Sequence, residues 1–93
     1  MKKVATRTKL PFAVDYGGLM GTALLVALAV ARDATYFWEM SSDQKVWVDL
    51  PSTMKAKTTA TGLTPATVYY FRFRAQTRKA MGDWSTVVSY IAR

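Results

Sequence analysis

Hydrophobic and polar positions alternate along the chain in short stretches that turn residues separate. The clearest stretch is 68–77, where Tyr69, Phe71, Phe73 and Ala75 alternate with mostly polar or charged residues. A period of two is typical of a strand with one buried face. Shorter stretches of this kind, divided by Gly, Pro, Asp and Ser, predict strands at 22–29, 35–41, 46–48, 55–61 and 84–92, and 4–10 is a candidate first strand ended by Pro11.

About seven short strands at roughly ten-residue spacing predict an all-β domain, an antiparallel sandwich with Greek-key connections. A length of 93 residues allows one modest core. A helix is the alternative for 19–31, because Ala and Leu are good helix formers. We favour a strand there because the rest of the chain has no helical pattern.

The uncharged segment 19–31 (LMGTALLVALAVA) also raises the question of a membrane or export signal. Its 13 residues are too few for a transmembrane helix, which needs about 20. Basic residues precede it, and Ala29-Val30-Ala31 resembles a signal-peptide cleavage site. The charge of Asp15 and the turn pair Gly17-Gly18 favour a core strand instead, and cleavage after Ala31 stays as the alternative.

The chain from about Leu24 onward resembles the fibronectin type III family. The run Leu63-x-Pro65-x-Thr67-x-Tyr69 resembles the turn into that family's sixth strand, and the resemblance implies that Tyr69 is its tyrosine corner, with its hydroxyl bonded to backbone just upstream. Three further matches are Tyr36, the pair Ser42-Asp43 followed by Trp47 as in bacterial members, and Gly82-Asp83-Trp84-Ser85. The resemblance implies a fibronectin-type-III/immunoglobulin-like sandwich and, through its bacterial members, an extracellular or surface location.

The chain also departs from the family. Ala27 stands where the family usually has Trp, and we expect Trp38 to fill the vacated volume, since a cavity would cost a few kcal/mol. Residues 1–18 do not follow the family, so we predict an atypical N-terminal arm or extra strand there, and a domain at 19–93. The loop 78–83 lacks Arg-Gly-Asp, so integrin binding is not implied.

The large aromatic side chains are expected to form the core, because so small a domain needs them there. They are Tyr36, Trp38, Trp47, Tyr69, Phe71, Phe73 and Trp84.

Catalytic chemistry has little support in the composition. The chain has no His and no Cys, which excludes imidazole triads, thiolate nucleophiles and zinc fingers. Its six acidic residues form no pair at helical or strand spacing, and its glycines form no phosphate-binding loop. We therefore expect no enzyme activity and no catalytic, cofactor or metal site.

The second strand is apolar on both faces. If Leu25 and Ala27 face the core, then Leu24, Val26 and Leu28 face outward, whereas a half-exposed strand normally alternates apolar with polar residues. Such a patch marks a contact surface. Either residues 1–18 fold over it or another subunit covers it, so we predict an assembly interface at these three residues or at the N-terminal arm.

The basic strand 68–77 offers a second candidate surface. The chain has 13 Lys and Arg against 6 Asp and Glu, a net charge of +7. Arginines mixed with aromatics can bind single-stranded nucleic acid or an anionic polysaccharide. The alternative is a solvated face on which Arg stems cover aromatic edges. The candidate residues for a polyanion or partner are Phe37, Tyr70, Arg72, Arg74, Arg78 and Lys79.

These observations predict a non-catalytic structural or interaction module. Self-association through the second-strand face or the N-terminal arm is the first hypothesis, and a protein partner is the expected ligand. Binding of an anionic polymer is the alternative.

Overall fold

The computed structural model of the chain describes residues 12–27 and 33–93. These residues form seven strands and no helix. The strands are β1 (Phe12–Tyr16), β2 (Ala23–Ala27), β3 (Thr35–Ser41), β4 (Val48–Asp49), β5 (Lys57–Ala60), β6 (Val68–Gln76) and β7 (Val88–Ile91).

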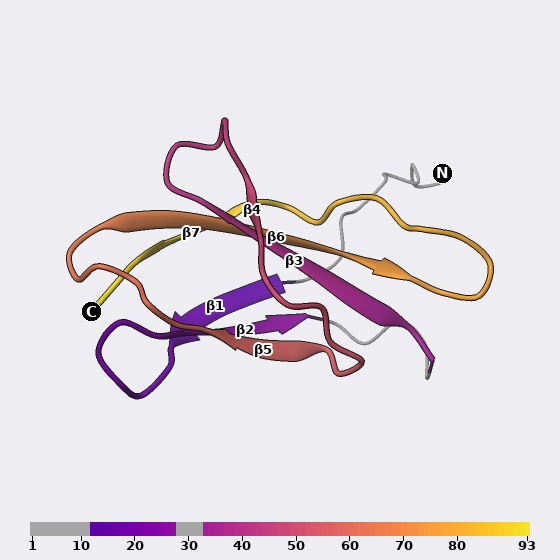
Figure 1. Cartoon of the computed structure of the whole chain (residues 1–93), viewed down its shortest axis with the longest axis horizontal. Helices are drawn as coiled ribbons and strands as arrows, with labels where there is room; N and C mark the ends of the chain where they lie inside the picture. Colours follow the sequence, from indigo (N-terminus) through magenta and orange to yellow (C-terminus); the bar gives the residue numbers. More distant parts are fainter. Residues whose placement is uncertain (1–11, 28–32) are drawn as a thin grey trace, which may run out of the picture.

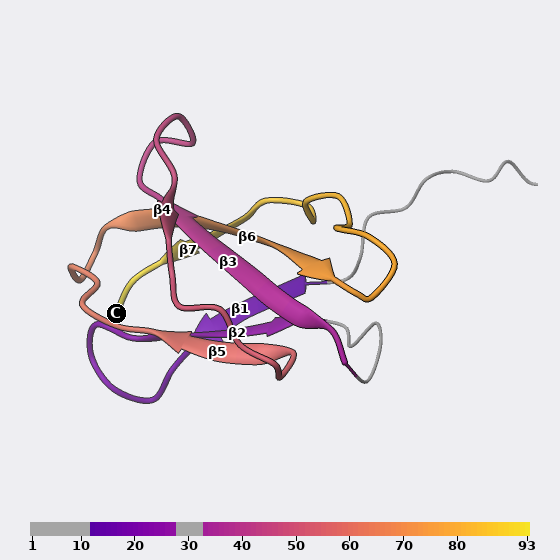
Figure 2. The same ribbon diagram turned by 45° about the vertical axis from the view of Figure 1, so that its right-hand side comes forward.

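The strands form two antiparallel sheets that pack face to face (Figures 1 and 2). One sheet has the order β1-β2-β5, and the other has the order β4-β3-β6-β7. The chain passes from one sheet to the other after β2, after β4 and after β5. This arrangement confirms the predicted all-β sandwich.

The core lies between the sheets and is rich in aromatic rings. Tyr36, Trp38, Phe71 and Phe73 are each at most 1% exposed. The Trp38 ring lies 5.7 Å from that of Phe73, and its indole Nε1 donates a hydrogen bond to Thr53 Oγ1 at 3.0 Å. Trp38 and Ala27 belong to the same buried cluster, and the Trp38 ring also lies 6.2 Å from that of Phe12, the residue that pairs with Ala27.

The core prediction was wrong for Trp47 and Trp84. Both side chains are half-buried and lie outside the buried cluster. They cover arginines on the outer face of the four-stranded sheet instead, because a guanidinium group can stack on an indole ring at the surface.

Strand β3 has the predicted bounds, but β4 is shorter and later than predicted. The predicted strand 46–48 begins inside a turn, because the Asp43 carboxylate accepts backbone hydrogen bonds from Lys45 at 2.8 Å and Val46 at 3.0 Å. These bonds hold Val46 in the turn, so strand pairing begins at Val48.

The last strand also begins later than the predicted 84–92. The Ser85 backbone N–H donates to the Phe73 carbonyl at 2.7 Å, and the Ser85 hydroxyl accepts the Phe73 N–H at 3.0 Å. The hydroxyl takes the place of a backbone acceptor, so the regular ladder with β6 starts only at Val88.

Part of the predicted N-terminal arm or extra strand, residues 1–18, is a strand in the structure. The candidate strand 4–10 lies outside the described residues. Phe12–Tyr16, within the predicted arm, form β1 and pair along their whole length with β2. Phe12 anchors this strand, because its ring packs 5.2 Å from that of Phe73.

Candidate interaction surfaces

The outer face of the three-stranded sheet carries the predicted apolar residues of β2. Leu25 is fully buried and Ala27 is 8% exposed, whereas Val26 is 41% exposed and Leu24 is half-buried. The side chains therefore alternate as the sequence predicts, with apolar residues on both faces. Leu28, the third residue of the predicted interface, lies outside the described residues.

The strand register places three polar residues and one alanine around these apolar residues. Val26 pairs with Ala13 on β1 and with Lys57 on β5, and Leu24 pairs with Asp15 on β1 and with Thr59 on β5. The four flanking residues are all exposed. We call this set of six side chains the Val26 face, and its residues are Ala13, Asp15, Leu24, Val26, Lys57 and Thr59.

The outer face of the four-stranded sheet carries an alternating stack of arginines and tryptophans. The Arg72 guanidinium carbon lies 4.1 Å from the ring centre of Trp47 and 4.2 Å from that of Trp84. The Arg74 guanidinium carbon lies 4.4 Å from the same Trp84 ring. The stack runs Trp47–Arg72–Trp84–Arg74, and each guanidinium is held against an aromatic face.

Two of the arginines predicted to bind a polyanion are already paired with carboxylates. Arg72 donates from Nη2 and Nε to Glu39 Oε1, at 2.6 and 2.9 Å. Arg78 forms an exposed ion pair with Asp33 at 2.9 Å. These pairs lower the positive potential that a polyanion would meet at the face.

The predicted polyanion residues are only partly brought together. Phe37 pairs with Arg74 across β3 and β6, while Tyr70 lies towards the other end of β6, opposite Ser41. Arg78 and Lys79 follow the end of β6 in an exposed loop. The face thus holds a compact centre at Phe37, Arg72 and Arg74, with the remaining candidates at its margins.

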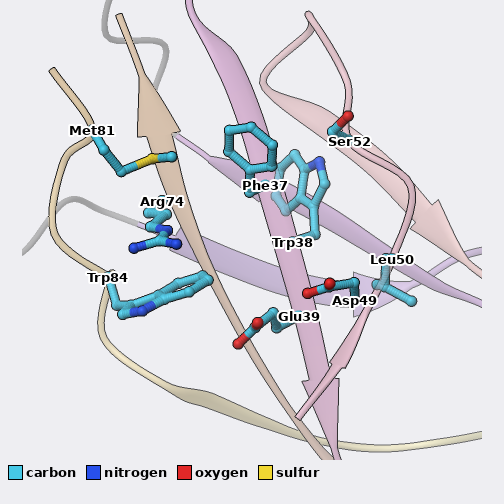
Figure 3. Close-up of a pocket in the computed structure, with 9 residues that line it drawn as sticks. All are labelled: Phe37, Trp38, Glu39, Asp49, Leu50, Ser52, Arg74, Met81 and Trp84. Atoms are coloured by element: carbon cyan, nitrogen blue, oxygen red, sulfur yellow. The ribbon is translucent and has the colours of Figure 1, made fainter.

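A cavity of about 330 Å³ lies against the end of this stack. Figure 3 shows Arg74 beside Trp84 on one side, with Phe37 and Glu39 projecting from β3. Asp49 also lines the cavity, and Arg74 Nε is buried with no hydrogen-bond partner among the described residues. With Arg74, Glu39 and Asp49 all at its wall, the cavity presents both signs of charge rather than a basic groove.

The arginine–tryptophan stack was missed by the sequence reasoning. A usable pattern was present, since Trp47 and Trp84 sit beside turn residues and outside any alternating run, while Arg72 and Arg74 share one face of β6. Large aromatics next to polar turns can serve as covers for arginine stems rather than as core.

Tyr69 joins the loop before β6 to the strand itself. Its hydroxyl accepts a hydrogen bond from the Thr64 backbone N–H at 2.9 Å, which is the bond that the family resemblance implies. This bond lowers the pKa of Tyr69, because it favours the phenolate.

Metal-binding clusters are absent from the part of the chain that the structure describes, where no three acidic residues gather closely enough to hold an ion. In the same residues no helix is long and apolar enough to cross a membrane.

Comparison with known proteins agrees with the two-sheet architecture. The solution structure of the sixth fibronectin type III domain from human fibronectin type III domain containing protein 3 superposes with a TM-score of 0.73 and 22% identity, over 99% of this chain and 90% of that chain. The crystal structure of FN3tt gives a TM-score of 0.75 at 23% identity, over 90% of this chain and 91% of that chain. The chain has the fibronectin type III fold.

In sequence, the chain is similar to part of a curated protein. A titin homolog of Caenorhabditis elegans is 38% identical over 47 residues, which is 50% of this chain. The match spans so little of that protein that the share rounds to 0% of its length. No family model matches the chain.

Proposed function

We propose that the chain is a non-catalytic interaction module that associates with itself through the Val26 face. The observation that carries the proposal is Val26, a β-branched apolar residue left 41% exposed in the central strand of a sheet, with Leu24 beside it on the same face. A central strand with one solvated face normally places polar side chains there. The fibronectin type III fold supports a module of this kind, because such sandwiches present rigid β surfaces.

The size of the face sets the strength expected of the contact. Three strands about 4.8 Å apart and five residues long cover roughly 15 by 17 Å. Specific, stable interfaces of standard size bury about 800 Å² on each partner, several times that flat area. We therefore expect a weak, concentration-dependent dimer, which would gain strength from avidity if modules were linked in series.

Binding of an anionic polymer is the less supported alternative. Arg72 is tied to Glu39 and enclosed by two tryptophans, and Arg78 is paired with Asp33. A polymer would have to compete with these internal partners. Val26, by contrast, is 41% exposed, so no ion pair or ring contact has to be broken before a second copy can cover it.

The test measures the association of the Val26→Lys variant by sedimentation velocity over a range of chain concentrations. A lysine at this position should shift the chain to monomer, because its ammonium group would be desolvated in the contact. Val48→Lys is the matched control, since Val48 is also a strand valine, is 54% exposed and belongs to the other sheet.

We expect Val48→Lys to associate like the wild type. A wild-type chain that stays monomeric at millimolar concentration would overturn the proposal. Equal association of Val26→Lys and the wild type would overturn it as well.

A further inference from the structure

We infer that two copies of the chain pack Val26 face to Val26 face around a two-fold axis that sets Asp15 of each copy against Lys57 of the other. The inference rests on the proposed self-association and names the orientation of the two copies. It adds two residues, Asp15 and Lys57, as the charges that select this orientation.

The strand register places these two charges at opposite corners of the face. Asp15 lies on β1 beside Leu24, and Lys57 lies on β5 beside Val26. The two positions are thus two strands apart across the sheet and two residues apart along it. Ordinary sheet spacings give roughly 12 Å between them along the diagonal. The other two corners carry the small side chains of Ala13 and Thr59.

Only one two-fold arrangement of the face pairs these opposite charges. An axis in the contact plane and perpendicular to the Asp15–Lys57 diagonal exchanges the two corners, so each Asp15 meets a Lys57. An axis along the strands would set Asp15 against Thr59, and an axis across the strands would set it against Ala13. An axis along the diagonal would set like charges together, which is repulsive.

The resulting contact is self-complementary, as a two-fold interface must be. Leu24 and Val26 lie at its centre, and one charge pair lies at each end. The strands of the two copies would cross at roughly 70°, near the orthogonal class of sheet packing. Small residues at the remaining corners let the two sheets approach.

Both charged side chains are available for such a contact. Asp15 and Lys57 are exposed, and neither forms an ion pair with another described residue. The described ion pairs of the chain are Glu39–Arg72 on the other sheet and Asp33–Arg78 in the loops.

Charge reversal in two separate chains tests the orientation. We would measure dimer formation by sedimentation velocity for Asp15→Lys alone, for Lys57→Asp alone, and for an equimolar mixture of the two variants. Each single variant sets like charges together at both ends of its own dimer, so association should weaken about tenfold. The mixture restores two opposite-charge pairs in the mixed dimer, so association should return close to the wild-type level.

The controls carry the same changes of net charge away from the face. Asp83 and Lys79 both lie in the exposed loop between β6 and β7. We expect Asp83→Lys and Lys79→Asp to change association only as far as the altered net charge requires. Single reversals on the Val26 face that behave like these controls would overturn the inference, and so would a mixture that stays as weak as its components. If these fail while Val26→Lys still dissociates the dimer, the orientation is wrong and the proposed face stands.

Discussion

Arg72 is the residue on which the outer face of the four-stranded sheet is built. Its side chain is 23% exposed and forms an ion pair with Glu39, which is 15% exposed. Two tryptophan rings lie on either side of its guanidinium group. Arg72 therefore joins β3, β6 and the two segments that contribute Trp47 and Trp84, and its role is structural.

We predict that Arg72→Ala lowers the free energy of unfolding by about 2–3 kcal/mol, as measured by urea denaturation. The change removes two cation–π contacts and leaves the Glu39 carboxylate without its partner. Arg78→Ala is the control, because its ion pair is 82% and 48% exposed and should contribute under about 0.5 kcal/mol. Similar losses for the two variants would show that the stack adds nothing to stability.

Residue-level prediction succeeded where alternation is regular and failed where it is not. The inward side of β6 could be read from the sequence, because Phe71, Phe73 and Ala75 recur with a period of two. Trp47 and Trp84 could not be placed in this way, since each follows a turn and belongs to no periodic run. Their position depends on Arg72, a neighbour that only the folded sheet supplies.

At the scale of elements, the turn between β3 and β4 is organised by one carboxylate. Asp43 accepts hydrogen bonds from the backbone N–H groups of Lys45 and Val46 and from the Ser41 hydroxyl. These bonds favour the charged form and lower the pKa of Asp43 in the folded chain. The turn thus gains stability from an ionised Asp43.

We predict that Asp43→Asn is less stable than the wild type at pH 7, and that the difference narrows as the pH falls. The folded pKa lies below the unfolded value of about 4, so the contribution is complete above that value and is lost as the pH falls through the folded pKa. Urea midpoints of both chains between pH 7 and pH 2 give the measurement. A difference that stays constant over this range would contradict the role of the charge.

The order of elements was more predictable than their ends. Strands β3 and β6 follow clear patterns, but β4 and β7 begin where specific hydrogen bonds of Asp43 and Ser85 stop. An extra strand within residues 1–18 was among the predictions, but the bounds of β1 were not, because Pro11 suggested the end of a strand, whereas pairing with β2 begins at the next residue. Such boundaries depend on contacts between distant segments, which periodicity does not encode. The positions of Asp15 and Lys57 on the two strands that flank β2 likewise required the register.

At the scale of the whole molecule, the net charge of +7 separates the two candidate functions. Two copies of a chain with this charge repel each other, and salt screens that repulsion. Binding to a polyanion weakens with salt, because counterions are released on binding.

We therefore predict that raising the NaCl concentration from about 50 to 300 mM strengthens self-association and weakens retention on heparin. The screened repulsion between two whole chains should outweigh the loss at two exposed Asp15–Lys57 pairs. Sedimentation velocity at fixed chain concentration and heparin chromatography give the two measurements. Self-association that falls steadily with added salt would mean that exposed ion pairs, rather than apolar contact, hold the copies together.

We propose that two copies meet at the Val26 face, and a dilution series of the wild-type chain followed by methyl NMR is the direct test. We predict concentration-dependent shifts for the methyl groups of Leu24, Val26 and Ala13, while those of Val48 and Ile91, exposed on the other sheet, stay constant. Spectra that do not change on dilution, or changes centred on Val48 and Ile91, would contradict a contact at the Val26 face.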